Sequence, residues 1–301
     1  MAKIEVRPIG RTGLTTSLIG FGALEIGRDW GVGNASERTR PSEDDAGKTL
    51  HAVLDLGITL IDTASAYHRS EERIGQSLHG RRKEFVLATK CGEHNNEPET
   101  FYDFSFDAIR RSIDTSLRLL KTDSIDILQI HFGPNPDKVL DDGECVGAMK
   151  EARAAGKVRF LGASVDGPVL SRCIATGDFD MVQVGYSLLH QGEAERIAEA
   201  HRRGMGVFIR SGLGGGWLTS SALRVKRKDR PPGVNELLDL CAGDTELLTS
   251  LALHFLAQNE GISSVLVGSK SVDHVKKAII LLAMPVDEDL LAKAERVVRN
   301  A

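Results

Sequence analysis

The sequence lacks the cysteine pattern of a disulfide-stabilised or zinc-binding protein. Small secreted domains carry closely spaced cysteines, and zinc sites usually contain CxxC pairs. Here the cysteines lie far apart and form no such pair: Cys91, Cys145, Cys173 and Cys241. The spacing argues against a disulfide framework and against a metal site, and it predicts a protein of a reducing compartment.

Long apolar runs and a surplus of one charge are also missing. The longest apolar run, residues 278–286, is far shorter than the about 20 residues that a helix needs to span a bilayer. Residues 1–10 lack the apolar core of a signal peptide. The formal net charge of −4 gives no reason to expect nucleic acid or an acidic membrane as a partner. We therefore expect a cytoplasmic protein whose partners are small molecules.

What the sequence does contain is an alternation of short apolar segments with helical patterns along its 301 residues. Most of these segments are near-continuous apolar runs, which are typical of parallel strands buried on both faces. The helical patterns have recognisable ends: in residues 42–57, Ser42 is the expected N-cap and Gly57 follows the last helical residue. The predicted strands are residues 17–22, 59–64, 85–90, 126–132, 159–164, 181–187, 206–211 and 263–269.

Eight strand–helix units in a chain of this length predict a (β/α)₈ TIM barrel, an α/β fold that forms one domain over residues 1–301. The competing fold is a doubly wound sheet, which usually carries GxGxxG at its first strand–helix turn. The segment GFGALEIG (20–27) spaces its glycines differently, and no helical pattern begins directly after it. The barrel is therefore the favoured architecture.

Three segments lie outside the strand–helix repeat. The N-terminal segment predicts a β-hairpin that turns at residues 11–13 and plugs the barrel from below. Residues 213–244 form a long insertion with glycines and a basic run, which is typical of a lid or binding loop. Residues 287–300 predict an extra amphipathic helix at the C-terminus.

Polar residues mark the ends of several predicted strands, which is where a barrel forms its active site. Asp62 follows the second apolar strand, Tyr67 lies in the next loop, and Lys90 and His131 stand at the ends of the third and fourth. Each also has a purely structural interpretation: a strand-end cap, a packed loop tyrosine, a surface lysine and a core histidine. Ser70 is the expected N-cap of the helix that follows.

Taken together, these residues favour proton transfer. A lysine in the barrel mouth is costly to desolvate unless a carboxylate pairs with it, and Asp62 lies one strand away. An ammonium beside Tyr67 is expected to lower the pKa of the phenol below its reference value of about 10 and to make it a general acid. His131 could donate a second hydrogen bond to the oxygen that receives the Tyr67 proton. This arrangement would suit protonation of a substrate carbonyl oxygen while a hydride reaches the carbonyl carbon.

The sequence resembles an aldo-keto reductase over nearly its whole length. The resemblance is carried by LIGFGA (18–23), DAGKTLHAVLDLGITLIDTASAY (45–67), SEERIGQSL (70–78), FVLATK (85–90), SLRLLKTDSIDILQIH (116–131), ARAAGKVRFLGAS (152–164) and SSVLVGSKSVDHV (263–275). Members of this family are (β/α)₈ barrels that bind NADPH, less often NADH, without a Rossmann domain. The resemblance places the catalytic tetrad on Asp62, Tyr67, Lys90 and His131. It implies that Tyr67 is the acid/base, that Lys90 lowers its pKa, that Asp62 holds Lys90, and that His131 orients the carbonyl.

The resemblance also implies a cofactor site, from which this sequence departs in places. Ser164 and Gln183 match residues that hold the nicotinamide carboxamide, although Val165 replaces the usual asparagine. Arg210 stands where an aromatic residue often stacks on the nicotinamide, and its planar guanidinium can also stack. The other implied cofactor contacts are Ala23, Asp62, Ser211, Gly212, Leu213 and Gly214 toward the nicotinamide and pyrophosphate, and Gly268, Ser269, Lys270 and His274 toward the adenosine.

The cofactor is expected to be NADP, with NAD as the alternative. Lys270, together with His274 or Lys277, would favour a 2′-phosphate, while the structural interpretation of these basic residues is a solvated helix face. The usual Glu-Asn pair of this motif reads Lys277-Ala278.

Substrate contacts are inferred from position alone. Trp30 and Phe132 are expected to line the pocket, and His68 replaces the glycine that usually follows the catalytic tyrosine. Specificity is expected to reside in the loops at residues 23–42, 132–142 and 213–244. The substrate, the direction of hydride transfer and the oligomeric state stay open.

The leading hypothesis is an NADP(H)-dependent oxidoreductase acting on an aldehyde, a ketone or a sugar hemiacetal. A second hypothesis is a dinucleotide-binding sensor or regulatory subunit on the same fold. A third is a Schiff-base lyase that uses Lys90, which pairing with Asp62 would disfavour because a protonated lysine is a poor nucleophile.

Overall fold

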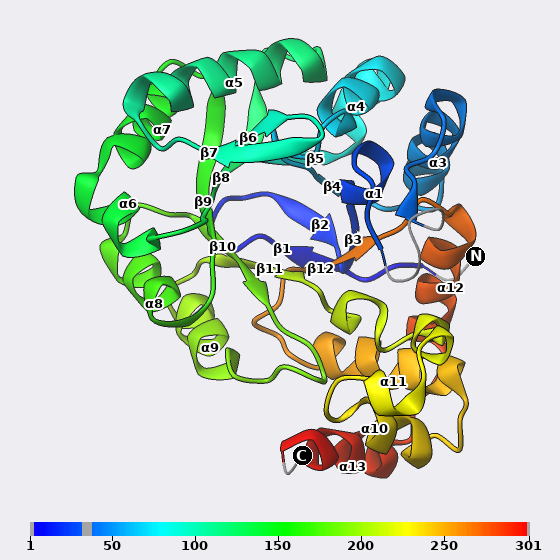
Figure 1. Ribbon diagram of the computed structural model, residues 1–301. Helices are drawn as coiled ribbons and strands as arrows, with labels where there is room; N and C mark the ends of the chain where they lie inside the picture. Colours follow the sequence, from blue (N-terminus) through cyan, green and yellow to red (C-terminus); the bar gives the residue numbers. More distant parts are fainter. Residues whose placement is uncertain (1–2, 32–37, 300–301) are drawn as a thin grey trace.

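Eight parallel strands close into a barrel at the centre of the computed structural model, which describes residues 3–31 and 38–299 (Figure 1). Each strand pairs with the next one along the chain, and β12 closes the barrel against β3. The strands are β3 (Ile19–Gly22), β4 (Leu60–Asp62), β5 (Val86–Cys91), β8 (Ile125–His131), β9 (Val158–Ser164), β10 (Met181–Gly185), β11 (Gly206–Arg210) and β12 (Ser264–Gly268). The predicted (β/α)₈ barrel is confirmed.

A ring of helices surrounds the barrel, one after each strand (Figure 1). They are α3 (Glu43–Asp55), α4 (Ser70–Leu78), α5 (Phe106–Leu120), α7 (Glu144–Ala154), α8 (Gly167–Thr176), α9 (Ala194–Arg202), α11 (Thr245–Ala257) and α12 (Val272–Ala283). The ends of α3 match the prediction, because Ser42 caps the Asp45 N–H and Gly57 adopts a positive φ of 88° just past the helix. Over the described ranges, no helix combines the length and apolar character needed to cross a membrane.

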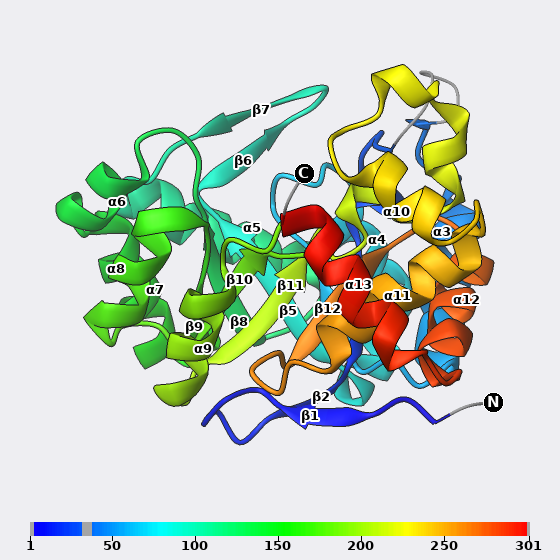
Figure 2. The same cartoon turned by 90° about the horizontal axis from the view of Figure 1, so that it is seen from below.

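The N-terminal hairpin lies across the lower end of the barrel (Figure 2). Its strands β1 (Val6–Pro8) and β2 (Thr15–Ser17) pair antiparallel, as the turn at residues 11–13 predicted. Ile9 of this hairpin is fully buried and packs in one cluster with side chains from the barrel strands, including Leu60 and Phe208. The cluster fills the barrel interior at this end, so the carboxyl ends of the strands are the place to look for a site.

The opposite end of the barrel carries the insertions (Figure 2). After β5 the chain forms a hairpin of β6 (Glu93–Asn96) and β7 (Glu99–Tyr102), which the sequence patterns did not predict. The long segment at 213–244 contains three short 3₁₀ helices and α10 (Val234–Leu240). The shorter additions are α1 (Leu24–Gly27) and α6 (Pro136–Asp142), and the C-terminal α13 (Glu288–Arg299) packs against α10 and α11, as an extra helix.

Candidate functional site

The neighbouring strands β4 and β5 bring a carboxylate and an ammonium into contact inside the barrel mouth. Asp62 pairs in register with Ala88, so that Lys90 stands just beyond it on the next strand. Lys90 is only 1% exposed, and its Nζ lies 2.5 Å from Asp62 Oδ2 and 3.0 Å from the Thr63 carbonyl oxygen. These acceptors replace the water that burial removes from the ammonium.

The second oxygen of Asp62 is also occupied. Gln129 Nε2 on β8 and Gln183 Nε2 on β10 donate to Asp62 Oδ1 at 2.8 and 2.9 Å. Side-chain donors from three different strands therefore hold the carboxylate in one orientation against Lys90. Gln129 was missed in the sequence, although it stands directly opposite Lys90 in the β5–β8 register.

Tyr67 and His131 complete the group around this ion pair. The loop after β4 turns tightly, with the Tyr67 N–H donating to the Ala64 carbonyl oxygen at 3.0 Å. This turn places the Tyr67 hydroxyl 3.5 Å from Lys90 Nζ. The rings of Tyr67 and His131 meet edge to face, with their centroids 6.0 Å apart. The four predicted residues thus converge at the carboxyl ends of the strands.

The pKa shifts differ from the sequence expectation at Tyr67. Burial raises the pKa of the Tyr67 phenol above its usual value of 10.0, and the opposing charge of Lys90 does not outweigh that effect. The expectation of a lowered tyrosine pKa is therefore wrong for the protein alone. Burial by itself would lower the pKa of Lys90, yet the charge of Asp62 and the contact with Tyr67 together raise it. Both groups are consequently protonated at neutral pH.

Ser70 has a different task from the one predicted. The position before α4 is occupied by Arg69, which makes no side-chain cap, and Ser70 is the first helical residue. The buried Ser70 hydroxyl instead donates to the Ala23 carbonyl oxygen and accepts from Thr63 Oγ1, both at 2.8 Å. Ser70 therefore ties the loop that carries Tyr67 to the end of β3, and the prediction that it caps the helix is corrected.

A carboxylate that sequence reasoning missed lies beside His131. Glu93, the first residue of β6, places Oε2 2.9 Å from His131 Nδ1, although the geometry falls short of an aligned hydrogen bond. Burial lowers the pKa of His131, and Glu93 opposes that effect without cancelling it. Burial raises the pKa of Glu93, but contacts with His131 and Thr100 reverse the shift and lower it overall. The polar turn residues Asn96 to Pro98 were the available signal for this hairpin.

The residues expected to hold the nicotinamide lie at the mouth, but their polar atoms already have protein partners. Gln183 is buried, and its Oε1 accepts a hydrogen bond from the Ser164 hydroxyl at 3.3 Å while its Nε2 binds Asp62. Arg210 forms an ion pair with Asp166, a residue that the sequence did not single out. Asp166 also accepts the Gly185 N–H at 2.8 Å, so this pair links the ends of β9, β10 and β11.

The segment after β11 offers fewer free backbone donors than the sequence suggested. Ser211 has a positive φ of 56°, and the chain turns so that the Gly214 N–H donates to the Ser211 carbonyl oxygen at 2.7 Å. The Gly216 N–H is likewise used by the Leu213 carbonyl oxygen. Of the four residues predicted near the pyrophosphate, Gly214 therefore has its N–H engaged within the turn.

The start of α12 forms a compact polar corner. Its N-cap, Ser271, provides no side-chain cap for the first helical N–H groups. Ser269 Oγ accepts the Ser271 N–H at 3.0 Å and lies 3.2 Å from His274 Nδ1, while Lys270 Nζ donates to the Thr39 carbonyl oxygen at 2.9 Å. Lys277 is paired with Glu246 at 2.6 Å, which agrees with the interpretation as a solvated helix face.

The residues proposed to line the substrate pocket differ in exposure. Trp30 is 53% exposed, whereas Phe132 is partly buried against the main core. His68 has a positive φ of 46°, and its Nε2 is buried without a hydrogen-bond partner. Residues 32–37 of the proposed specificity loop at 23–42 lie outside the described residues.

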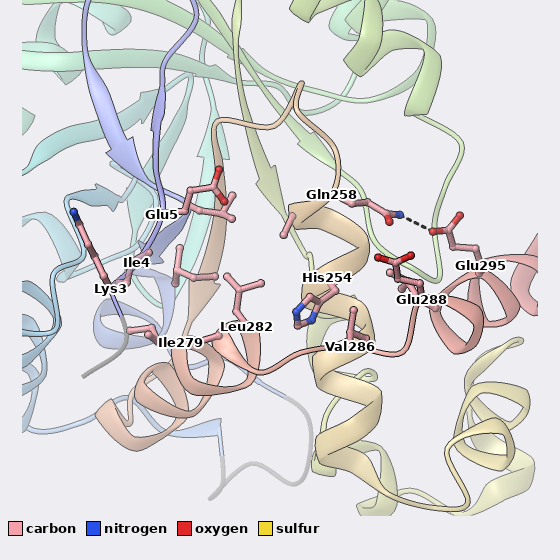
Figure 3. Close-up of a pocket in the computed structure, with 16 residues that line it drawn as sticks. Lys3, Ile4, Glu5, His254, Gln258, Ile279, Leu282, Val286, Glu288 and Glu295 are labelled. Atoms are coloured by element: carbon pink, nitrogen blue, oxygen red, sulfur yellow. Dashed lines mark hydrogen bonds between the residues drawn. The ribbon is translucent and has the colours of Figure 1, made fainter.

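A separate cavity of about 530 Å³ lies between the N-terminal segment and helices α11, α12 and α13 (Figure 3). Its walls are largely apolar, and its rim carries Glu5, Glu288 and Glu295. Leu18 and Ile19, at the start of β3, line it as well, so it opens near the amino end of the barrel. None of the four converging residues lines this cavity, which is therefore not the candidate active site.

Comparison with known proteins gives one consistent result. Residues 18–299 match the model of the Aldo/keto reductase family. The L-galactose dehydrogenase of Arabidopsis thaliana is 31% identical, over 99% of this chain and 95% of that protein. The NADH-specific methylglyoxal reductase of Escherichia coli is 27% identical, over 91% of this chain and 92% of that protein. Among solved structures, the holo form of an aldo-keto reductase from Bacillus halodurans matches with a TM-score of 0.79 and 26% identity, over 99% of this chain and 96% of that one.

Proposed function

Because this chain belongs to the aldo/keto reductase family of oxidoreductases, we propose that it is an NADP(H)-dependent enzyme in which Tyr67 is the general acid/base. Its substrate would be an aldehyde, a ketone or a sugar hemiacetal. The observation that carries this proposal is the buried Lys90 ammonium, held 2.5 Å from Asp62 and 3.5 Å from the Tyr67 hydroxyl.

The residues at the mouth fit a nicotinamide dinucleotide at both of its ends. The α12 start offers helical N–H groups without a side-chain cap next to Ser269 and Lys270, which suits a phosphate. Ser164 and Gln183, at the ends of β9 and β10, bond to one another, and Gln183 also bonds to Asp62. A free lone pair on each of their side-chain oxygens would suit the N–H of an amide group. When bound, the nicotinamide would supply or accept the hydride.

The protein's own residues would then move the proton. Tyr67 is protonated at neutral pH, since burial raises its pKa, so it can donate its hydrogen to a substrate carbonyl oxygen. The phenolate left behind would lie beside the Lys90 ammonium, which offsets its negative charge. The negative charge of Asp62 keeps Lys90 protonated. Asp62 also holds Lys90 in place, because two glutamine donors fix the carboxylate itself.

The preference for NADP rests on Lys270 and His274 at the start of α12. The relative named as NADH-specific makes NAD the alternative cofactor. The names of the relatives, a galactose dehydrogenase and a methylglyoxal reductase, favour small polar carbonyl compounds and sugars as substrates.

The proposal is tested by following nicotinamide absorbance with NADPH and NADH against a panel of aldehydes, ketones and sugars. We expect Tyr67→Phe to lose about 10²–10⁴-fold in kcat/KM while cofactor affinity stays within about twofold. Full activity of that variant would remove Tyr67 from the mechanism. Tight binding of the dinucleotide by the unaltered protein, with no turnover on any compound of the panel, would instead favour a sensor.

A further inference from the structure

The β6–β7 hairpin projects from the end of the barrel that carries the insertions (Figure 2). Glu93 and Tyr102 stand directly opposite each other in its register, so their side chains lie on the same face of the hairpin. Glu93 Oε2 is 2.9 Å from His131 Nδ1, which identifies this face as the one beside the barrel mouth. Tyr102 therefore stands next to the converging catalytic residues.

The Tyr102 ring is packed on one face and open elsewhere. Its packed face lies on the backbone of Gly133, two residues beyond His131, where an added methyl group would come within 2.3 Å of the ring. Phe104 stacks beside it, with ring centroids 6.0 Å apart. Tyr102 is nevertheless 42% exposed. A large aromatic surface is thus held in place and left uncovered near the mouth.

Charged groups border this ring. Burial raises the pKa of the Tyr102 phenol, the charge of Glu93 raises it further and that of Arg28 lowers it, so the three side chains share one space. Arg28 Nη1 lies 3.9 Å from Glu93 Oε1, which is too far for a hydrogen bond. Among the described residues, no acceptor takes a hydrogen bond from this guanidinium, and the Arg28 side chain is 26% exposed. Arg28 therefore has donors left for a ligand.

We propose that Tyr102 and Arg28 form a wall of the substrate pocket that recognises a pyranose sugar. The aromatic face packs on the C–H groups of the sugar ring, and the Arg28 fork donates to its hydroxyl groups. An aromatic substrate also fits the ring, but it would desolvate Arg28 and Glu93 without offering them partners, which is costly. This inference rests on the proposed function and narrows its substrate class to sugars in their ring form.

The same strand supplies a matched control. Phe101 is 49% exposed and stands on the opposite face of the hairpin, where it stacks on His94 with ring centroids 5.1 Å apart. Phe101→Ala therefore removes an exposed aromatic ring of similar size and leaves the proposed wall intact. Gly133→Ala provides a second probe, because the added methyl group must displace the Tyr102 ring without removing it.

The kinetic test compares kcat/KM for the oxidation of L- and D-galactose with NADP⁺ and for the reduction of glyceraldehyde with NADPH. We expect Tyr102→Ala to lose about tenfold for the better galactose, mainly through a higher KM, because the ring loses its stacking partner. The loss for glyceraldehyde should stay below about threefold, since a three-carbon chain covers little of the ring. Gly133→Ala and Arg28→Gln should show the same selective loss, and Phe101→Ala should keep both values within about twofold.

The contact itself is read by saturation-transfer NMR. The probes are the 1,5-anhydro derivatives of both galactose enantiomers, which keep the pyranose ring but lack the anomeric hydroxyl and so cannot react. Irradiation of the aromatic protons of the protein should saturate ring C–H protons of a bound probe. We expect this transfer to fall sharply in Tyr102→Ala and to persist in Phe101→Ala.

Four results would overturn the inference. They are equal losses for galactose and glyceraldehyde in Tyr102→Ala, an equally large galactose loss in Phe101→Ala, no saturation transfer in the unaltered protein, and turnover of glyceraldehyde or benzaldehyde with neither galactose. The last two need no variant, and Gly133→Ala serves if Tyr102→Ala does not fold. Absence of turnover on every compound would count against the proposed function, while the NMR result would still decide whether Tyr102 contacts a sugar.

Discussion

The two ends of the proposed dinucleotide site are built in different ways. At the catalytic end, Asp62 and Lys90 project from barrel strands and are almost fully buried. Their hydrogen-bond partners come from each other, from β8 and β10, and from the loop after β4. At the adenosine end, Lys270 and His274 stand on a loop and the first turn of α12, with partners supplied locally or by residue 39. In the proposed site, the rigid barrel would position the reacting groups, and loops that tolerate change would set the choice of cofactor.

The largest effect is expected from breaking the buried ion pair. Lys90→Met would leave Asp62 buried without its cation, which typically costs about 3–5 kcal/mol of folding free energy. The loss of the ammonium beside Tyr67 should also lower kcat/KM by about 10²–10⁴-fold. Chemical denaturation and steady-state kinetics measure the two effects. Lys277→Met, which breaks an exposed ion pair on α12, is the matched control. Equal losses of stability and of kcat/KM in both variants would contradict the difference between the two ends.

A pH-dependent effect is expected from Glu71, a buried residue of α4 whose carboxylate contacts β5 and α5. Burial raises its pKa to about 7, even though Thr89 and Ser116 donate to the carboxylate. Because the folded pKa exceeds the unfolded one, this contribution to stability is fully present below pH 4.5 and is lost as pH rises through about 7. The lost stability amounts to about 3 kcal/mol.

The measurement for Glu71 is the free energy of unfolding from urea titrations between pH 5 and 8. Glu71→Gln should remove most of the decline with rising pH, since a neutral amide has no proton to lose. A decline of the same size in the variant would show that another group causes it.

An intermediate effect is expected from the glutamine that orients Asp62. Gln129→Leu removes one of the two donors to Oδ1, and a buried acceptor that loses a donor typically costs about 1–3 kcal/mol. The carboxylate gains freedom to turn, so kcat/KM should fall while cofactor affinity stays constant. Thermal unfolding and a comparison of kcat/KM with dinucleotide Kd test this. A change in Kd alone would place Gln129 in cofactor binding instead.

The smallest effect is expected at the adenosine end. Lys270→Ala should weaken NADPH binding by about tenfold, the size of one surface phosphate contact, and should leave NADH binding and folding stability unchanged. Lys277→Ala should change neither affinity, because its ammonium is paired with Glu246. Fluorescence titrations of the unaltered protein and both variants with each dinucleotide give the dissociation constants. An equal loss for NADPH and NADH in Lys270→Ala would contradict a role in recognising the 2′-phosphate.

Much of the fold and the centre of the site could be predicted from the sequence. The eight apolar segments could be recognised because near-continuous apolar runs are typical of parallel strands buried on both faces. The polar residues at the strand ends could be grouped because all parallel strands of a barrel end at the same mouth. Asp62, Tyr67, Lys90 and His131 were placed together on that basis. The direction of the Tyr67 pKa was predicted wrongly, because the depth of its burial is not visible in the sequence.

The partners of the charged groups were not predictable in the same way. Glu93 reaches His131 from a hairpin that no apolar pattern announced, and Asp166 reaches Arg210 from a different loop. Ser70 has the residue type of a helix cap, but its hydroxyl donates a hydrogen bond to the Ala23 carbonyl oxygen instead. In each case the choice of partner depends on a distance between residues far apart in the chain.

By itself, the sequence determined the order of strands and helices and which side chains stand at the strand ends, because apolar periodicity and chain order suffice for both. The tertiary structure alone decided which donors face which acceptors. Closing the barrel brings Gln183 within 2.9 Å of Asp62, 121 residues earlier in the chain, and hydrogen bonds and ion pairs depend on such distances to within a fraction of an ångström.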